Sequence, residues 1–334
     1  MSPLEQFSNS LANQNILIVG DVMVDAYMWG SVSRISPEAP VPIVAINRRE
    51  RRLGGAANVA FNLRSLGAKP IICTVVGNDD EGKEFLQIMY HHDMDKRGVI
   101  TSDNRITTVK TRIIGNRNHV CRVDEEQTSP LAPVDEQALM ERIDLIFRTM
   151  PIHGVILQDY DKGCITPAVI DYVVALAARK RVVTTVDPKH RNFALFHDVT
   201  LFKPNLKELS EGLNIDIDAS TTDTLRRDLD RAALLLHERQ HIDIVHVTLS
   251  DKGAYACDFR NGEPQSLLIP AQRRDICDVS GAGDTVISVI TLALATGLDT
   301  ATAVHYANVA GGLVCEEVGV VPINRERLLQ EISL

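Results

Sequence analysis

The segment Asn15-Ile16-Leu17-Ile18-Val19-Gly20-Asp21 is a short apolar run that ends in a glycine and an aspartate. A run of this kind is typical of a strand buried on both faces of a parallel sheet, with a polar residue at its carboxyl end. Similar runs recur along the chain, at residues 71–77, 154–159, 181–187, 200–205 and 244–250. The pattern predicts a mostly parallel sheet.

Amphipathic helical patterns lie between these runs, at residues 56–66, 82–91, 134–150, 166–180 and 225–240. Strands that alternate with helices predict an α/β fold with helices on both faces of the sheet. Ligands in such sheets bind at the carboxyl ends of the strands. The polar residues expected at these ends are Asp21, Asp159, Asp187, Asn205 and Ser250.

Residues 27–47 and 104–124 break this alternation. The second stretch has two β-like runs separated by Gly115-Asn116, which predicts a hairpin. Together the stretches predict a small β layer beside the main sheet, as a lid or a dimer surface. No repeat or linker divides the chain, so we expect one domain over residues 1–334 with these lid segments inserted in it.

Composition excludes several classes of protein. The net charge is -9 and aromatic residues make up 4% of the 334 residues, which argues against a nucleic-acid partner. The apolar run at 286–295 is too short to span a bilayer, and the N-terminus has no signal-peptide pattern. The six cysteines are scattered, as in a reducing compartment. We therefore expect a soluble cytoplasmic protein without a membrane partner.

The segment Asp278-Val279-Ser280-Gly281-Ala282-Gly283-Asp284-Thr285 precedes a long apolar run. Small residues at a helix start leave backbone N–H groups free for phosphate oxygens, and the helix dipole favours the same anion. A carboxylate next to that site, here Asp284, can take a proton from an attacking hydroxyl. By itself the segment is equally well a tight strand-to-helix turn capped by an acid.

Three other segments each allow a functional and a plain structural interpretation. Gly54 and Gly55 followed by Asn58 fit close approach of a sugar, or a simple turn. Asn205 and Glu208 fit water-mediated Mg²⁺ binding, or helix capping. Residues 248–254 fit a nucleotide site, or a hairpin turn, and residues 301–312 predict a closely packed helix beside adenine or another helix.

Motifs of other enzyme classes are missing from the sequence. It has no Walker-type phosphate loop, no G-x-G-x-x-G after the first strand and no G-x-S-x-G elbow. P-loop nucleotide hydrolysis is excluded, and a dinucleotide site and hydrolase chemistry are disfavoured.

The order of the remaining motifs resembles the ribokinase-like carbohydrate kinases, also called the phosphofructokinase-B family. The matching pieces are Gly-Asp after the first strand, Gly-Gly-x-x-Asn, Asn-x-x-Glu and D-x-x-G-A-G-D-T, over residues 16–323. Residues 20–27, 34–42, 53–67, 158–163 and 186–189 are similar to kinases of D-glycero-β-D-manno-heptose 7-phosphate, which serve lipopolysaccharide core synthesis through ADP-heptose. No H-x-G-H signature of a fused nucleotidyltransferase occurs, so a stand-alone kinase is expected.

This resemblance implies a role for each motif. Asp284 is the base, and Gly281, Ala282 and Gly283 form the anion hole. ATP and Mg²⁺ are the implied cofactors, and K⁺ is a weaker expectation, at Asp278. Mg²⁺ is expected at Asn205 and Glu208 through water. Sugar hydroxyls are assigned to Asp21, Gly54, Gly55 and Asn58, and the nucleotide to Asn205, Ser250, Lys252, Gly253 and Asn308.

A phosphorylated sugar also needs a cation to meet its phosphate. The candidates are Lys110, Arg112, Arg122, Lys162 and Lys189, with Asp159 close to the sugar. A homodimer through the lid is expected from the family. Two alternatives stay open: another kinase of this family, acting on ribose, fructose 1-phosphate or a nucleoside, and a non-catalytic sugar sensor with the same fold.

Overall fold

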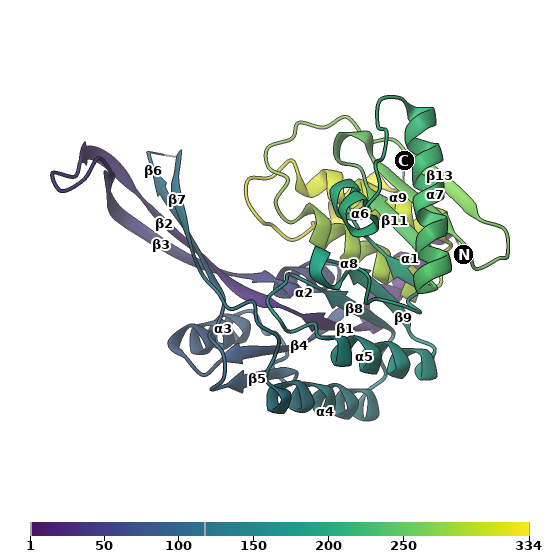
Figure 1. The fold of residues 1–334 in the computed structure, drawn as a ribbon, viewed down its shortest axis with the longest axis horizontal. Helices are drawn as coiled ribbons and strands as arrows, with labels where there is room; N and C mark the ends of the chain where they lie inside the picture. The colour runs from purple at the N-terminus through teal and green to yellow at the C-terminus, as the bar shows by residue number, and fades with distance from the viewer. Residues whose placement is uncertain (1, 117, 334) are drawn as a thin grey trace.

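The computed structural model describes residues 2–116 and 118–333, and its strands form two sheets of unequal size (Figure 1). The larger sheet has the order β13-β12-β11-β10-β9-β8-β1-β4-β5. Pairs from β11 to β5 are parallel, whereas β12 and β13 extend the sheet as antiparallel strands. Its strands are β1 (Asn15–Gly20), β4 (Lys69–Gly77), β5 (Val99–Ser102), β8 (Gly154–Gln158), β9 (Val183–Asp187), β10 (Leu201–Phe202), β11 (Ile244–Thr248), β12 (Ala254–Asp258) and β13 (Gln265–Ile269).

The order of the strands reverses beside β1. This strand pairs with β4 on one side and with β8 on the other. From β4 the chain continues outward to β5, and from β8 it continues through β9 and β10 to β11. The carboxyl ends of β1 and β8 therefore flank a topological switch point, which is where open α/β sheets bind ligands. Asp21 follows β1 and Asp159 follows β8.

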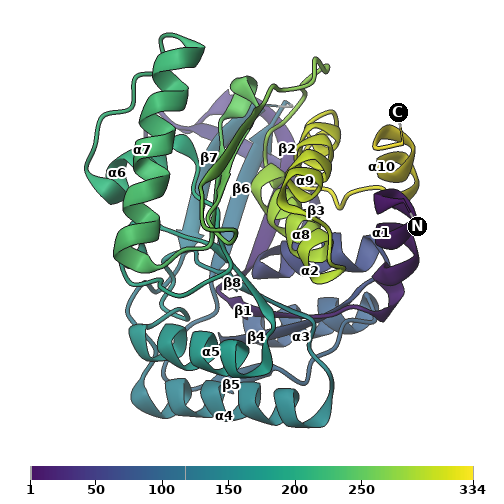
Figure 2. The same ribbon diagram turned by 90° about the vertical axis from the view of Figure 1, so that its right-hand side faces the viewer.

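Helices cover both faces of the larger sheet, as predicted (Figure 2). The helices are α1 (Pro3–Ser10), α2 (Ala56–Ser65), α3 (Asp80–His91), α4 (Pro133–Thr149), α5 (Pro167–Lys180), α6 (Leu206–Leu213), α7 (Thr222–Gln240), α8 (Ala282–Ala295), α9 (Thr300–Val314) and α10 (Arg325–Glu331). Short 3₁₀ turns occur at Leu11–Asn13, His190–Asn192 and Ser250–Lys252. Across the described parts of the chain, none of these helices has both the length and the apolarity needed to cross a bilayer.

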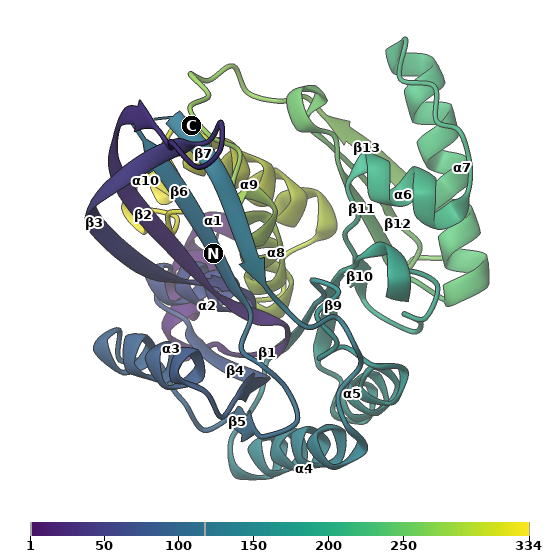
Figure 3. The ribbon, with the colours of Figure 1, turned by 60° about the vertical axis from the view of Figure 1, so that its left-hand side comes forward.

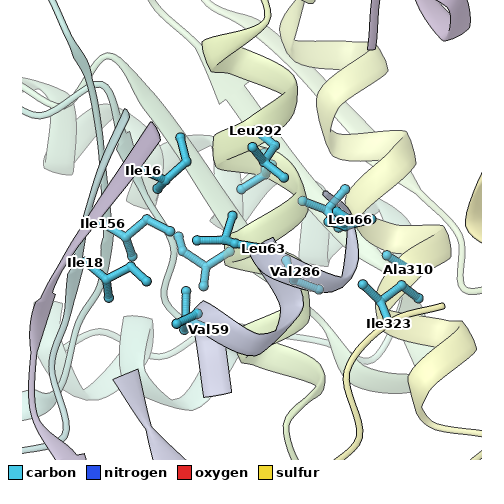
Figure 4. Packing of buried hydrophobic residues seen from close by; sticks show 14 of the residues in the cluster. Ile16, Ile18, Val59, Leu63, Leu66, Ile156, Val286, Leu292, Ala310 and Ile323 are labelled. Carbon is cyan, nitrogen blue, oxygen red and sulfur yellow. The ribbon is translucent and has the colours of Figure 1, made fainter. Parts of the chain in front are cut away.

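Two apolar cores follow from the alternation of side chains along β1. Ile16 and Ile18 point to one face, where they lie in one cluster with Val59 of α2 and Leu292 of α8 (Figure 4). Leu17, like Val19, belongs to the second core, under α4, α5 and α7. Because α2 and α8 share the first core with β1, the starts of both helices are fixed next to the switch point.

The ends of the helices follow ordinary capping chemistry. At α5 the Thr166 side chain accepts the Val169 N–H, and Pro167 occupies the first helical position, where no N–H is needed. The helix ends because Arg181 takes a left-handed conformation with φ of 56°.

The smaller sheet, which we call the lid, projects from the carboxyl-end side of the larger one (Figures 1 and 3). Its strands, in the order β3-β2-β6-β7, are β2 (Val22–Ile35), β3 (Pro42–Gly55), β6 (Val109–Gly115) and β7 (Asn118–Glu125). The hairpin expected within 104–124 is confirmed as β6 and β7, which pair antiparallel. Strands β2 and β3 reach beyond the expected 27–47, because β2 starts directly after Asp21 and β3 continues to the start of α2.

Candidate active site

The segment around Gly281 forms the start of α8. Gly281 precedes the helix with φ of 81°, a conformation that L side chains rarely adopt. A Cβ on Gly281 would lie 3.0 Å from Asn58 Nδ2 and 3.1 Å from Val320 Cγ1. Within the described residues, the N–H groups of Gly283 and Asp284 have no backbone acceptor. These free donors at a helix N-terminus can bind an anion.

Side chains from α2, from β8 and from the loop after β8 meet at Asp284, in the first turn of α8. Asn58 Nδ2 donates to Asp284 Oδ2 at 2.6 Å. The Tyr160 hydroxyl donates to Oδ1 at 2.6 Å, and Gln158 Nε2 donates to the same oxygen at 3.2 Å. Asp284 is 7% exposed. A nearly buried carboxylate is thus held by three donors beside a helix N-terminus.

Burial sets the protonation of this carboxyl group. It raises the pKa of Asp284 to about 6, because the charged form loses hydration. The hydrogen bonds from Tyr160 and Asn58 and the charge of Lys203 act in the opposite direction, whereas Asp187 raises the pKa further. Asp284 is therefore ionised at neutral pH and still basic enough to take a proton.

A buried ion pair lies next to Gly283. Lys203 Nζ is 3.0 Å from Asp187 Oδ2, and the Lys203 side chain is 3% exposed. A Cβ on Gly283 would lie 3.6 Å from this Nζ. Gln158 Nε2 donates to Asp187 Oδ2 at 3.1 Å and so links the ion pair to Asp284. Lys203 brings a positive charge close to the free N–H groups of α8.

The glycine pair at the end of β3 lies against Asp25 of β2. A Cβ on Gly54 would be 2.1 Å from Asp25 Oδ2, so only glycine leaves room for that carboxylate. Gly55 has φ of 62° and ends the strand where α2 begins, which places Asn58 in the first turn of that helix. Asp25 is 7% exposed and lies 2.5 Å from Arg112 Nη1.

Asp21 follows β1 as predicted, but its side chain has other partners than the expected sugar hydroxyls. Its Oδ2 accepts the N–H groups of Tyr160 at 2.9 Å and Lys162 at 3.1 Å, and its Oδ1 accepts that of Cys164 at 2.8 Å. It is 1% exposed. The prediction that Asp21 holds sugar hydroxyls does not fit this geometry, because its oxygens bind the loop after β8.

Asp159 binds both this loop and the 3₁₀ turn that follows β9. Its oxygens accept the Asp161 N–H at 2.8 Å and Asn192 Nδ2 at 2.9 Å, and it is fully buried. Burial raises its pKa to about 7. The expected place for Asp159, close to the sugar, also disagrees with this arrangement, since its side chain points into the loop.

Charged and aromatic side chains gather on one face of the lid. In the strand register Asp25 pairs with Arg52 and Lys110, and Tyr27 pairs with Arg112, which faces Arg122. Because cross-strand partners share a face, these residues lie together, and we call them the cationic face. Arg52 Nη1 would be 3.6 Å from a Cβ on Gly319, whose N–H binds Asp278. The cationic face is thus turned toward the start of α8.

The candidate cations differ in what they contact. Arg122 bonds to Asp124 at 2.9 Å, and Lys162 Nζ lies 2.9 Å from Glu126. Burial and the neighbouring charge of Lys162 lower the pKa of Lys110. Lys189 pairs with Glu208 and lies over the Tyr160 ring, with Nζ 5.9 Å from its centroid. Lys110 therefore lies near the charges of Lys162 and Arg122, and Arg112 lies two residues further along the same strand.

The segment with Asn205 and Glu208 forms a reciprocal capping box at α6. Glu208 N–H donates to Asn205 Oδ1 at 2.8 Å, and Asn205 N–H donates to Glu208 Oε2 at 2.9 Å. Among residues 2–116 and 118–333, no three histidine, cysteine, aspartate or glutamate side chains cluster as a metal site would require. The capping interpretation is thus realised, and any metal here would keep much of its water.

Of the predicted nucleotide residues, Ser250, Lys252 and Gly253 lie between β11 and β12, and Asn308 lies on α9. Ser250 has φ of 55° in the turn joining β11 to β12, and Gly253 follows with φ of 94°. Lys252 Nζ donates to the Ala219 carbonyl, and Asn308 Nδ2 donates to the Pro270 carbonyl at 3.2 Å. The turn is the plain hairpin that the sequence also allowed. Asp278 bridges Ser280 and Gly319 through their N–H groups at 2.9 and 3.0 Å.

Sequence reasoning missed four residues of the site: Gln158, Tyr160, Lys203 and Asp25. Gln158 and Tyr160 lie within residues 158–163, one of the segments similar to the heptose 7-phosphate kinases, whereas Lys203 follows β10 and no local pattern marks it. Asp25 does have a sequence signal, since it lies within residues 20–27, one of the segments that are similar to the heptose 7-phosphate kinases.

Comparisons with known proteins agree on one family. A profile of the pfkB family carbohydrate kinases matches residues 13–327. The bifunctional protein HldE of Methylobacillus flagellatus is 38% identical over 318 residues, which cover 95% of this chain and 63% of that protein. HldE of Helicobacter pylori is 36% identical over 321 residues, covering 96% of this chain and 66% of that protein. The chain thus spans just under two thirds of the length of these relatives.

Solved structures show the same fold. Phosphofructokinase-2 from Escherichia coli in complex with potassium has a TM-score of 0.73 at 17% identity, covering 96% of this chain and 99% of that one. Ribokinase from Arabidopsis thaliana, complexed with ribose and ATP, has a TM-score of 0.70 at 16% identity, with coverage of 96% and 99%. The ribokinase-like α/β fold expected from the sequence is confirmed.

Proposed function

The chain belongs to the pfkB family of carbohydrate kinases, and we propose that it phosphorylates the anomeric hydroxyl of D-glycero-β-D-manno-heptose 7-phosphate with ATP, giving the 1,7-bisphosphate. The kinase family implies ATP and a divalent metal. The observation that carries the proposal is the position of Asp284: a buried, ionised carboxylate beside free N–H groups at a helix start. We treat residues 1–334 as one kinase domain with the lid inserted in it.

Asp284 is the base in this proposal. With a pKa of about 6 it is ionised at neutral pH and can take the proton of the anomeric hydroxyl as that oxygen attacks phosphorus. The hydroxyl has to approach between Asp284 and the start of α8. A base fixed by three hydrogen bonds keeps this geometry without reorganisation, which is how positioned groups lower a barrier.

The start of α8 is the anion hole. Among residues 2–116 and 118–333 the N–H groups of Gly283 and Asp284 have no backbone acceptor, and the glycines at 281 and 283 keep side chains out of the space in front of them. Lys203, close to Gly283, adds a positive charge where the transferring phosphoryl group gains negative charge. Stabilisation of this kind is the largest contribution in phosphoryl transfer.

On the sugar side we propose that Asp25 takes the role predicted for Asp21. Asp25 lies against Gly54, and Asn58 reaches from the same corner to Asp284. Carboxylate and amide groups accept and donate hydrogen bonds to hydroxyls. Gly55 lets the chain turn there without a side chain in the way.

The cationic face of the lid is the proposed site for the 7-phosphate. Burial and the neighbouring charges of Lys162 and Arg122 lower the pKa of Lys110, and Arg112 lies two residues further along β6, on the same face of the strand. A doubly charged phosphate would relieve this repulsion and accept hydrogen bonds from Arg112. Arg122 and Lys189 are further candidates, and each of them, like Arg112 and Lys162, already pairs with a carboxylate.

The residues around α6 fit a divalent metal held through water. Asn205 and Glu208 present oxygen atoms at the end of β10, and Mg²⁺ prefers oxygen ligands and keeps several of its waters. When bound, the metal neutralises phosphate charge. Glu208 would hold one of those waters while Lys189 keeps its carboxylate in place. Asp278 is the proposed K⁺ residue. The nucleotide is assigned to Asn205, Ser250, Lys252, Gly253 and Asn308.

A homodimer through the lid is also part of the proposal, together with a cytoplasmic location. Ile35 and Val41 near the tip of the lid are 59% and 52% exposed, and Val123 on β7 is 46% exposed. Apolar side chains at the surface favour an interface. Sedimentation of wild type and Val123→Asp tests this, since a monomer in both would contradict it.

The proposed function is tested by ADP release with Mg-ATP. The panel contains the heptose 7-phosphate, the same heptose without phosphate, ribose, fructose 1-phosphate and adenosine, with Asp284→Asn as the control. We expect turnover on the heptose 7-phosphate, and much less on the unphosphorylated heptose. Turnover on another acceptor alone would overturn the substrate and keep the kinase. Sugar binding without any turnover would favour the sensor alternative.

A further inference from the structure

The two oxygens of Asp284 are not equivalent. A carboxylate offers about four lone-pair positions, two on each oxygen. Oδ1 accepts from both Tyr160 and Gln158, so its two positions are taken. Oδ2 accepts only from Asn58 among the described residues, which leaves one position open. That oxygen lies on the side of Gly281, whose Cβ would be 3.0 Å from Asn58 Nδ2.

We propose that Tyr160 is a positioning residue that, together with Gln158, occupies Oδ1 of Asp284 and so makes Oδ2 the atom that receives the substrate proton. This inference rests on the proposed kinase function and deepens it. In the step itself the O–H bond of the acceptor hydroxyl breaks and its proton moves to Oδ2. The freed electron pair forms the new O–P bond, while the terminal P–O bond of the nucleotide breaks and its pair stays on the departing diphosphate.

Tyr160 can serve this role because its loop is held rigidly. Three N–H groups of residues 160, 162 and 164 converge on Asp21, and Arg105 Nη2 donates to the Lys162 carbonyl at 2.6 Å. Asp161 and Gly163 take positive φ values of 57° and 89°, which curls the loop around the carboxylate. Asp21 therefore acts on Asp284 through Tyr160, without touching substrate.

The charged groups around Asp284 come from several elements. Asp187 at the end of β9 and Lys203 after β10 have opposite effects on it, and Lys189 also interacts with its charge. Tyr160 itself stays protonated, because burial and the nearby carboxylates raise its pKa well above the usual value. It can therefore only donate to Oδ1, and its hydrogen bond favours the ionised form of Asp284.

The test is Tyr160→Phe, which keeps the ring and removes only the hydroxyl. Loss of this donor should raise the pKa of Asp284, so the acid limb of kcat/KM should move up by about one pH unit. KM for both substrates should change little. At a pH well above the limb, kcat should recover most of the wild-type value, which a general loss of structure would not allow. Tyr90→Phe, at an exposed tyrosine, is the matched control.

A second readout needs no turnover. Carbon-13 NMR follows the titration of the Asp284 carboxyl group in the free protein, identified by its loss in Asp284→Asn. We expect the same upward shift in Tyr160→Phe and a smaller one in Asp21→Asn, with no added shift when both are combined. An unchanged titration and an unchanged acid limb in Tyr160→Phe would overturn the inference. A shifted titration in a protein without kinase activity would support the positioning role and reject the proposed function.

Discussion

The centre around Asp284 and the cationic face of the lid are built in opposite ways. In the centre a single carboxylate is buried and bound by neutral donors from Asn58, Gln158 and Tyr160. On the lid, charges of both signs alternate across strands and remain partly exposed, as at Arg112, whose side chain is 22% exposed. The first arrangement fixes the carboxylate before any ligand binds, whereas the second holds cations whose charge an anionic ligand can neutralise.

This difference separates chemistry from recognition. A base has to stand at one position with a defined proton affinity, so it is fixed by hydrogen bonds to neutral groups. A surface that selects a phosphorylated substrate needs charge that the substrate itself will neutralise. Substitutions in the centre should therefore act on kcat, and substitutions on the lid on KM.

Among the substitutions that leave Asp284 in place, Gly281→Ala should have the largest effect. The added Cβ would meet Asn58 Nδ2 at 3.0 Å in a backbone conformation with φ of 81°. It would displace Asn58 from Asp284 and disturb the free N–H groups, and losing one donor of such a hole costs about 10²–10³ in kcat. Steady-state kinetics measure it. A KM effect with unchanged kcat would place Gly281 outside the reacting centre.

Arg112→Gln should come next, with an effect confined to the phosphorylated sugar. Losing a guanidinium that meets phosphate should raise KM for the heptose 7-phosphate by about 10- to 100-fold, because charge-assisted bonds contribute about 1.5–3 kcal/mol. KM for ATP should not change. The matched control is Arg49→Gln, on the opposite face of the same sheet. Equal effects of both variants on KM would show that the cationic face does not bind the phosphate of the sugar.

A third prediction concerns stability. The pKa of Asp284 is about 6 in the folded protein against 3.8 in the unfolded chain, so the folded state binds more protons between these values. Folding stability should then fall as pH rises from about 4 to 6. Asp284→Asn removes this loss, so its gain over wild type should be larger at pH 8 than at pH 4.5, by about 1–3 kcal/mol.

Urea unfolding at the two pH values measures this difference. The comparison between variant and wild type cancels the titration of Asp159 and other carboxyl groups that the two share. A difference in unfolding free energy that does not depend on pH would show that burial does not penalise the charged form of Asp284.

The smallest effect is expected at Tyr27, between two arginines of the lid. Arg52 and Arg112 lie over its ring, with their Cζ atoms 5.3 and 5.2 Å from the centroid. Tyr27→Leu should loosen both guanidinium groups and raise KM for the phosphorylated sugar only a few-fold, since exposed cation–π contacts contribute about 0.5–1 kcal/mol. An effect on kcat instead would contradict the assignment of catalysis to the centre around Asp284 and of substrate binding to the cationic face.

Sequence alone predicts the larger sheet well, because its signals are local. The apolar runs at 154–159 and 244–250 correspond to β8 and β11, whereas the order of the strands in the sheet, and with it the switch point, comes from the structure. The segment from Gly281 to Asp284 also lies where expected, at a helix start. The sequence does not predict which groups each polar side chain binds. Asp21 stands at a strand end as predicted, but the first loop residue that donates to it, Tyr160, is 139 residues later in the chain.

For some segments the sequence allows two structural interpretations, and only the contacts distinguish them. Asn205 and Glu208 satisfy the same spacing for capping and for water-mediated metal binding, and only the contacts show the cap. The predicted lid segment, residues 27–47, is too short, because Gly20-Asp21 is typical of a strand end followed by a loop. A second strand instead begins immediately at Val22, in the other sheet.

The most direct test of the account is Asp284→Asn, compared with wild type for product formation and for sugar binding by calorimetry. Amide and carboxylate have nearly the same shape, so the fold and the binding of the sugar should persist. We expect kcat to fall by about 10²–10⁴ while the affinity for the heptose 7-phosphate stays within a few-fold. A kcat near that of wild type would contradict the account, because Asp284 would then not be the base.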